Sequence, residues 1–169
     1  KPIFGCEAYF VPSIAEWRAD YERIMQDKKA ARAAKKAETS GATVEDEAAS
    51  KKAARNILNR RRHLVLLVQN QTGLNNLFKL ISESYQPENF YRYPRIDFDL
   101  LEKYNEGIIA SSACLGGVYA GCYWENREQG EKAVLDSMRS VTERMQSIFG
   151  DRWYGELQWN NIPEQHELN

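Results

Sequence analysis

Short runs rich in apolar, β-branched and aromatic residues recur along the chain and constrain what it can fold into. The runs lie at residues 3–11, 63–68, 107–112 and 153–159. Side chains of this kind at this density are typical of buried strands. The stretches between the runs have helical character. Strands that alternate with helices predict an α/β fold with parallel strand pairing, because each return crossover uses a helix.

Amphipathic helices are expected between the runs. The clearest covers residues 131–149, where apolar residues recur every three or four positions. A short helix is expected over residues 98–104, and another from residue 74 to about residue 85. After the first run, Ser13 can cap a helix and Glu16 completes a capping box.

The composition changes abruptly at residue 28. Residues 28–62 are mostly Ala, Lys, Arg, Glu and small polar residues, which predicts a helical insertion of two arms with a break at 39–41 and an acidic turn at 45–47. One interpretation is a basic arm that contacts nucleic acid. The other is a solvated helical insertion with few tertiary contacts. No aromatic residues are interleaved to stack on bases, and this favours the second interpretation.

The overall composition bounds the class of protein. A length of 169 residues suits one domain with one core, and a net charge of −1 gives no support for wholesale electrostatic binding of nucleic acid. Three cysteines without framework spacing fit a reducing compartment. No apolar stretch approaches the roughly 20 residues that span a membrane. We therefore expect a soluble, cytoplasmic protein. Both ends of the chain look structured, and this predicts a piece of a longer polypeptide.

Three residues of metal-ligand type, Glu7, His63 and Cys114, each lie beside one of the apolar runs. Strand ends are where parallel barrels place their chemistry, so the three residues form a candidate metal site. Each also has a structural explanation. His63 could be a satisfied structural histidine, Cys114 a small buried hydrophobe, and Glu7 a buried ion-pair partner of Arg95 or Arg152. The chain contains no P-loop, dinucleotide-binding glycine pattern, HExxH or GxSxG motif.

Five stretches together resemble, in order, the motifs of the PHP (polymerase and histidinol phosphatase) domain of bacterial-type DNA polymerase III α subunits, including phage-encoded relatives. They are residues 2–9, 63–77, 94–97, 106–117 and 149–158. The resemblance covers most of the chain outside about residues 28–59. The long insertion departs from the compact family pattern and favours a divergent member. We expect a phage-encoded one.

The resemblance implies that residues 1–169 are a partial PHP domain, in which part of a distorted (β/α)7 barrel carries the insertion at 28–62. It implies that Glu7, His63 and Cys114 are metal ligands, with zinc or manganese at this site and magnesium for polymerisation by the full protein. The family's His-x-His and Asp-x-His motifs are not in this chain. The segment alone is therefore expected to bind metal weakly and to hydrolyse nothing, and it supplies no catalytic residue beyond the ligands.

The resemblance implies a replicative DNA polymerase whose PHP part acts as a 3′–5′ exonuclease or phosphoesterase, or as a scaffold. The implied partners are DNA, the clamp and an exonuclease subunit, without a membrane. One alternative is a catalytically inactive module that binds a separate exonuclease. A stand-alone PHP phosphatase is a third alternative, against which the polymerase-like motifs at 94–97 and 114–117 argue. The sequence does not assign residues that bind nucleic acid.

Overall fold

The fold is built around a four-stranded sheet, in the order β1-β2-β5-β6. The computed structural model describes residues 2–36 and 44–169. The strands of the sheet are β1 (Gly5–Phe10), β2 (Arg62–Val68), β5 (Ile108–Ser111) and β6 (Trp153–Tyr154). A small hairpin of β3 (Phe90–Tyr91) and β4 (Tyr93–Pro94) lies apart from this sheet.

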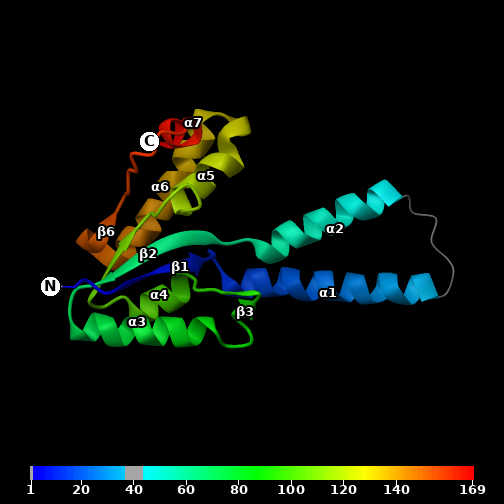
Figure 1. The fold of residues 1–169 in the computed structure, drawn as a ribbon, viewed down its shortest axis with the longest axis horizontal. Helices are drawn as coiled ribbons and strands as arrows, with labels where there is room; N and C mark the ends of the chain where they lie inside the picture. Colours follow the sequence, from blue (N-terminus) through cyan, green and yellow to red (C-terminus); the bar gives the residue numbers. More distant parts are fainter. Residues whose placement is uncertain (1, 37–43) are drawn as a thin grey trace.

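The helices fall into an arm and two groups beside the sheet (Figure 1). The arm consists of α1 (Ile14–Lys36) and α2 (Val44–Asn59). On the β1 side of the sheet lie α3 (Gln71–Ser84) and α4 (Phe98–Tyr104). On the β6 side lie α5 (Val118–Asn126), α6 (Glu131–Phe149) and α7 (Pro163–Leu168).

One face of the sheet forms the core and the other remains open. Alternate residues of β2 and β5 are buried, and they share one apolar cluster with residues of α3, α4 and α6. Its buried members include Leu64, Leu66, Ile108 and Ala110 from the strands, and Leu77, Leu80, Leu101, Met145 and Phe149 from the helices. Because successive side chains of a strand point to opposite faces, His63 and Val65 lie on the other, less covered face.

The mixed α/β composition is confirmed, but the predicted parallel pairing is wrong for β1 with β2 and for β2 with β5. Both pairs are antiparallel, and only β5 and β6 pair in parallel among the described strands of this sheet. The arm explains the first pair. The chain leaves β1 along α1 and returns along α2 to the end of the sheet that it left, so β2 runs in the opposite direction (Figure 1). A crossover connection would instead have carried the chain back to the end of the sheet where β1 begins, and β2 would then run parallel to β1.

Local predictions from periodicity were more accurate than the predicted pairing. The expected helices at 98–104 and 131–149 have the bounds of α4 and α6. Residues 45–47 lie inside α2, so the predicted acidic turn is wrong, and the predicted break at 39–41 lies outside the described residues. The strand expected over 153–159 is limited to its first two residues, because Leu157 is exposed to solvent and no apolar face continues.

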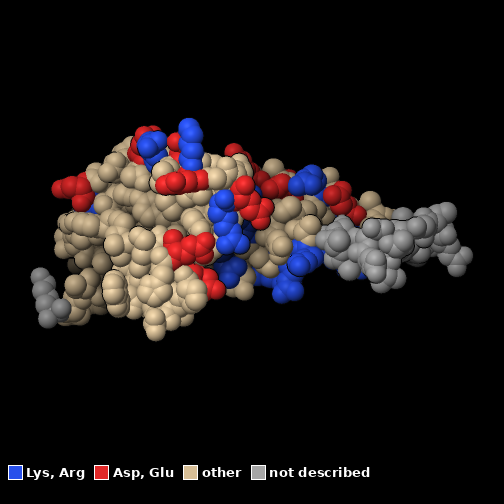
Figure 2. Space-filling view, turned by 90° about the horizontal axis from the view of Figure 1, so that it is seen from above, with Lys and Arg blue, Asp and Glu red and all other residues tan. Residues whose placement is uncertain are grey.

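The base of the arm is packed, whereas its shaft is exposed. The Ser13 hydroxyl accepts a hydrogen bond from the Glu16 N–H at 3.2 Å and caps α1 as predicted. Trp17 and Ile24 are buried, but every side chain at 26–33 is exposed. Figure 2 shows charged side chains of both signs along the described arm. In the described chain, no helix is long and apolar enough to cross a membrane.

A buried arginine joins the arm to the rest of the fold. The Arg95 side chain is fully buried and donates hydrogen bonds only to main-chain carbonyl oxygens among the described residues. These are the oxygens of Leu58 at 2.7 Å, Tyr93 at 2.8 Å, Tyr91 at 3.2 Å and Arg60 at 3.4 Å. One side chain therefore connects the end of α2, the segment leading into β2 and the β3–β4 hairpin.

The environment of Arg95 is apolar and positively charged. Its guanidinium lies 4.1 Å from the centre of the Trp17 ring, a cation–π contact that ties α1 to the same point. Burial, together with the nearby charge of Arg61, lowers the pKa of Arg95 to about 10. The side chain therefore stays charged at neutral pH. Its hydrogen bonds to the carbonyl oxygens offset the free-energy cost of removing this charge from water.

Replacing Arg95 by methionine is expected to lower the free energy of unfolding by about 3 kcal/mol, because several buried carbonyl oxygens would lose their donor. The measurement is urea unfolding followed by circular dichroism. Arg139→Met is the matched control, since Arg139 is exposed on α6 and pairs with Asp136 at 3.1 Å. The control should change stability by no more than about 0.5 kcal/mol. Equal stability of the two variants would show that Arg95 does not hold these segments together.

Candidate metal centre

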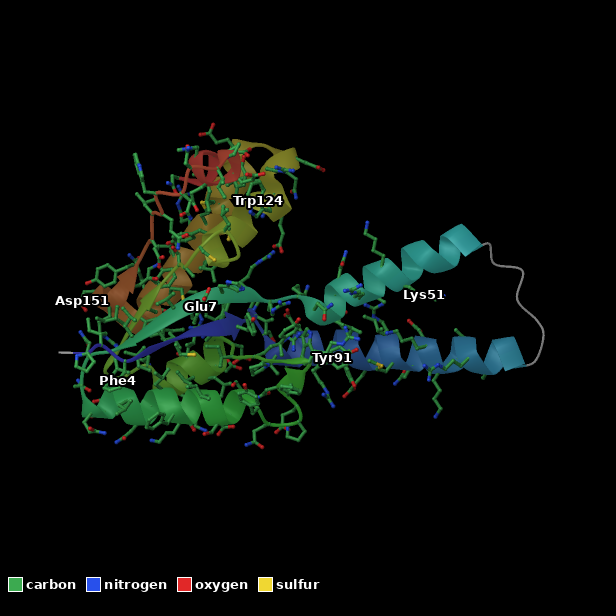
Figure 3. The ribbon with its side chains drawn as sticks, viewed as in Figure 1. Phe4, Glu7, Lys51, Tyr91, Trp124 and Asp151 are labelled. Atoms are coloured by element: carbon green, nitrogen blue, oxygen red, sulfur yellow. The ribbon has the colours of Figure 1, made fainter. Side chains whose placement is uncertain are left out.

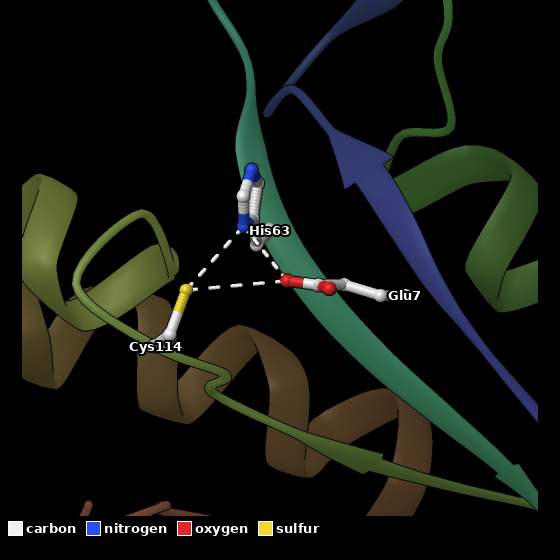
Figure 4. A group of neighbouring side chains, drawn as sticks. All are labelled: Glu7, His63 and Cys114. Carbon is white, nitrogen blue, oxygen red and sulfur yellow. Dashed lines mark hydrogen bonds and ion pairs between the residues drawn. The ribbon is translucent and has the colours of Figure 1, made fainter.

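Glu7 and His63 are brought together by the register of β1 and β2. Glu7 pairs across the ladder with Val65, and His63 lies two residues before Val65 on the same face. The two side chains are therefore diagonal neighbours, which are within reach of each other across an antiparallel pair. The His63 Nδ1 and Glu7 Oε1 atoms are 2.7 Å apart (Figure 4).

Cys114 reaches the same point from the loop that follows β5. Its Sγ atom lies 3.4 Å from His63 Nδ1 and 3.9 Å from Glu7 Oε1. The loop bends sharply at Ala113, which has a positive φ of 58°. A left-handed backbone costs a residue with a side chain about 1–2 kcal/mol, so the surrounding packing holds this turn in place.

The backbone of this loop is fastened directly to His63. The His63 N–H donates to the Gly116 carbonyl oxygen at 2.8 Å, and the Gly116 N–H donates to Cys114 Sγ at 3.4 Å. Gly117 lies so close to the chain before it that a Cβ atom would be 2.0 Å from the Ser112 oxygen. The glycine thus permits the tight return that places Cys114 opposite the histidine.

The three side chains form a compact set of donor atoms. One oxygen, one nitrogen and one sulfur all lie within 4.8 Å of one another. Imidazole, carboxylate and thiolate together suit a borderline ion such as zinc, and the oxygen and nitrogen donors also suit manganese. Their chemistry fits a divalent cation, which the three side chains would hold through one oxygen, one nitrogen and one sulfur.

The geometry decides between the structural explanations for these residues. Glu7 pairs with neither Arg95 nor Arg152, because Arg95 donates to carbonyl oxygens and Arg152 donates to those of Asn105 and Ile108. The expectation of a buried Glu7 is wrong, since 54% of its side chain is exposed. Cys114 is half-buried and contacts His63, unlike a small hydrophobe in the core. The role of the three residues as metal ligands remains a prediction.

A pocket borders this group along β1. Its volume is about 500 Å³, within the range of small-molecule sites, and Glu7 and Tyr9 are part of its lining. Residues of α3 and of the β3–β4 hairpin form the remaining walls, which are mostly apolar. Figure 3 shows Glu7 at the centre of the fold and Tyr91 of the hairpin toward the arm. His63 and Cys114 are not part of the lining, so the pocket adjoins Glu7 without enclosing the three donors.

Two further residues on the same face, Tyr9 and Arg61, were not among the residues predicted from the sequence. The Tyr9 ring lies 5.4 Å from the His63 ring, and the Arg61 guanidinium lies 4.7 Å from the Tyr9 ring. Strand alternation offered a signal, because Tyr9 is two residues from Glu7 and Arg61 is two residues from His63. The register that brings these two pairs together was not predictable from either strand alone.

Comparisons with known proteins identify the family of the chain. A family model described as the PHP domain matches residues 1–160. Proteins named DNA polymerase III subunit alpha are similar: that of Aquifex aeolicus is 37% identical over 169 residues, which is 100% of this chain and 11% of the relative. The corresponding protein of Borreliella burgdorferi is 43% identical over 107 residues, which is 63% of this chain and 9% of the relative. The protein of Deinococcus radiodurans is 31% identical over 169 residues, which is 100% of this chain and 10% of the relative. The chain thus spans about a tenth of the length of these relatives.

Gly117→Ala is expected to lower the free energy of unfolding by about 1–3 kcal/mol, because the new methyl group would overlap the Ser112 carbonyl oxygen. The measurement is again urea unfolding. Gly155→Ala is the control, since its methyl group would make an ordinary 3.5 Å contact with Tyr119. A Gly117→Ala protein as stable as the control would mean that the loop accommodates the methyl group without cost.

Proposed function

The chain belongs to the PHP domain family, and we propose that it is the metal-binding phosphoesterase segment of a replicative DNA polymerase III α subunit. The observation that carries this proposal is the convergence of Glu7, His63 and Cys114 on the open face of the sheet. The three residues come from β1, β2 and the loop after β5. The names and the similarity of the bacterial relatives support the assignment to a polymerase.

Each of the three residues has a distinct part in the proposed site. Glu7 and a deprotonated Cys114 would supply negative charge, and the neutral imidazole of His63 would supply nitrogen. The main chain of His63 is fixed by β2 and by Gly116, so its ring presents Nδ1 to the other donors. A divalent ion bound there, zinc or manganese by its donor set, would act as a Lewis acid toward a phosphodiester at a 3′ end.

Three ligands make an incomplete cluster, and we propose that other parts of the polypeptide supply the remainder. In this view the sheet is part of a distorted (β/α)7 barrel, and residues 28–62 are a helical insertion in residues 1–169. Magnesium-dependent polymerisation would reside elsewhere in the longer protein. DNA, the clamp and an exonuclease subunit are the proposed partners, in the cytoplasm of a bacterial or phage-infected cell.

His63→Ala is expected to weaken binding of Mn²⁺ or Zn²⁺ by at least about tenfold, because it removes the donor that contacts both other ligands. Metal titration of the chain, with elemental analysis of the longest natural form of the polypeptide, measures this. His166→Ala is the matched control, since His166 is the only other histidine of the sequence and lies in α7. Equal metal binding by both variants would rule out the proposed site.

In the longest natural form of the polypeptide, His63→Ala is expected to reduce removal of nucleotides from a 3′-labelled single strand by about a hundredfold, or about 3 kcal/mol. Polymerisation should remain measurable in the same preparation. A protein that holds metal but trims no DNA in its unaltered form would contradict the exonuclease role. A protein with neither metal nor trimming would instead support the inactive module that binds a partner exonuclease.

A further inference from the structure

A second group of side chains lies next to the metal-ligand group on the same face of the sheet. It consists of Tyr9, Arg61 and Tyr93, the arginine–tyrosine group. The Arg61 guanidinium lies 3.8 Å from the centre of the Tyr93 ring and 4.7 Å from that of Tyr9. The two rings meet edge to face at 5.4 Å. Such contacts hold the planar guanidinium in a fixed orientation.

The register of β1 and β2 repeats the same diagonal arrangement in both groups. Glu7 pairs with Val65, and His63 lies two residues before Val65. In the same way, Tyr9 pairs with His63, and Arg61 lies two residues before His63. The arginine–tyrosine group is therefore displaced from the metal-ligand group by two residues along each strand, which is about 7 Å. This separation is comparable with that between successive phosphates of an extended nucleic acid strand.

Arg61 differs in charge balance from the two arginines that flank it. Arg60 forms an ion pair with Asp20 at 3.4 Å, and Arg62 forms one with Glu125. Within the described residues Arg61 has no carboxylate partner. Its Nη1 donates to the Asn59 carbonyl oxygen at 3.0 Å, whereas its buried Nε atom has no acceptor among those residues. The buried Nε atom is out of reach of an external ligand, but a half-buried guanidinium without a carboxylate partner favours an external anion at its accessible edge.

A second uncompensated charge strengthens this preference. Arg95 lies near enough for the charge of Arg61 to contribute to the lowered pKa of Arg95, and its described acceptors are neutral carbonyl oxygens. Two positive charges without a carboxylate partner in the described structure create a local positive potential. Such a potential attracts anions even though the net charge of the whole chain is −1.

We propose that the arginine–tyrosine group is a phosphate subsite for single-stranded nucleic acid, next to the metal-ligand group. Arg61 binds the phosphate adjacent to the one at the metal-ligand group, and the two tyrosine rings hold its guanidinium in place for that contact. The subsite rests on the proposed function for its role in a reaction. Its binding of nucleic acid can be measured without turnover or bound metal.

The test is binding of a fluorescent oligothymidylate to the chain across a range of salt concentrations, with EDTA present. Arg61→Gln should weaken binding by about tenfold and reduce the salt slope by about 0.7, the value for one phosphate contact on a single strand. Arg60→Gln is the matched control, because Arg60 is adjacent, exposed and paired with Asp20. It should bind like the unaltered chain, and a Mn²⁺ titration should give the same affinity for all variants.

A conservative variant covers the case in which Arg61→Gln disturbs folding. Arg61→Lys keeps the charge but loses the planar fork, so it should keep the salt slope and still bind several-fold more weakly. Oligothymidylate binding by both variants like that of the unaltered chain would overturn the subsite. Loss of binding in Arg61→Gln, in a chain that takes up no metal, would refute the metal centre and leave the subsite standing.

Discussion

The buried guanidinium of Arg95 is the contact on which the arrangement of the sheet depends. Burying this charge is costly in free energy. Hydrogen bonds to carbonyl oxygens at the end of α2, on the approach to β2 and in the β3–β4 hairpin offset the cost. These contacts fix where the chain re-enters the sheet after the arm. A slip of one residue in β2 would turn His63 to the opposite face, so the position of this histidine depends on a residue that never touches it.

Much of the local structure follows from the sequence, because it depends on neighbours in the chain. The periodicity at 131–149 and the capping residues Ser13 and Glu16 predict helices that the structure contains. The direction of strand pairing does not follow in this way. It depends on whether the connection returns the chain to the end of the sheet where the first strand begins or leaves it at the end where that strand finishes. For β1 and β2, the packing of α1 against α2 decides this.

The candidate site divides along the same line. The side chains of Glu7, His63 and Cys114 were recognisable by type and by family resemblance, and the structure brings them together. Arg61 was not recognisable, since it stands in a run of three arginines that look alike in the sequence. They differ only in their surroundings: Asp20 and Glu125 neutralise the outer two, whereas aromatic rings enclose the middle one.

The paired helices of the arm have an evolutionary consequence. A hairpin that leaves a domain and returns to the same point can gain or lose whole turns at its tip without shifting the strands at its root. Mutations that alter its length therefore escape the selection that holds the strand register constant. The exposed shaft can diversify between lineages, while the packed base from Ile14 to Ile24 stays under the constraints of the core.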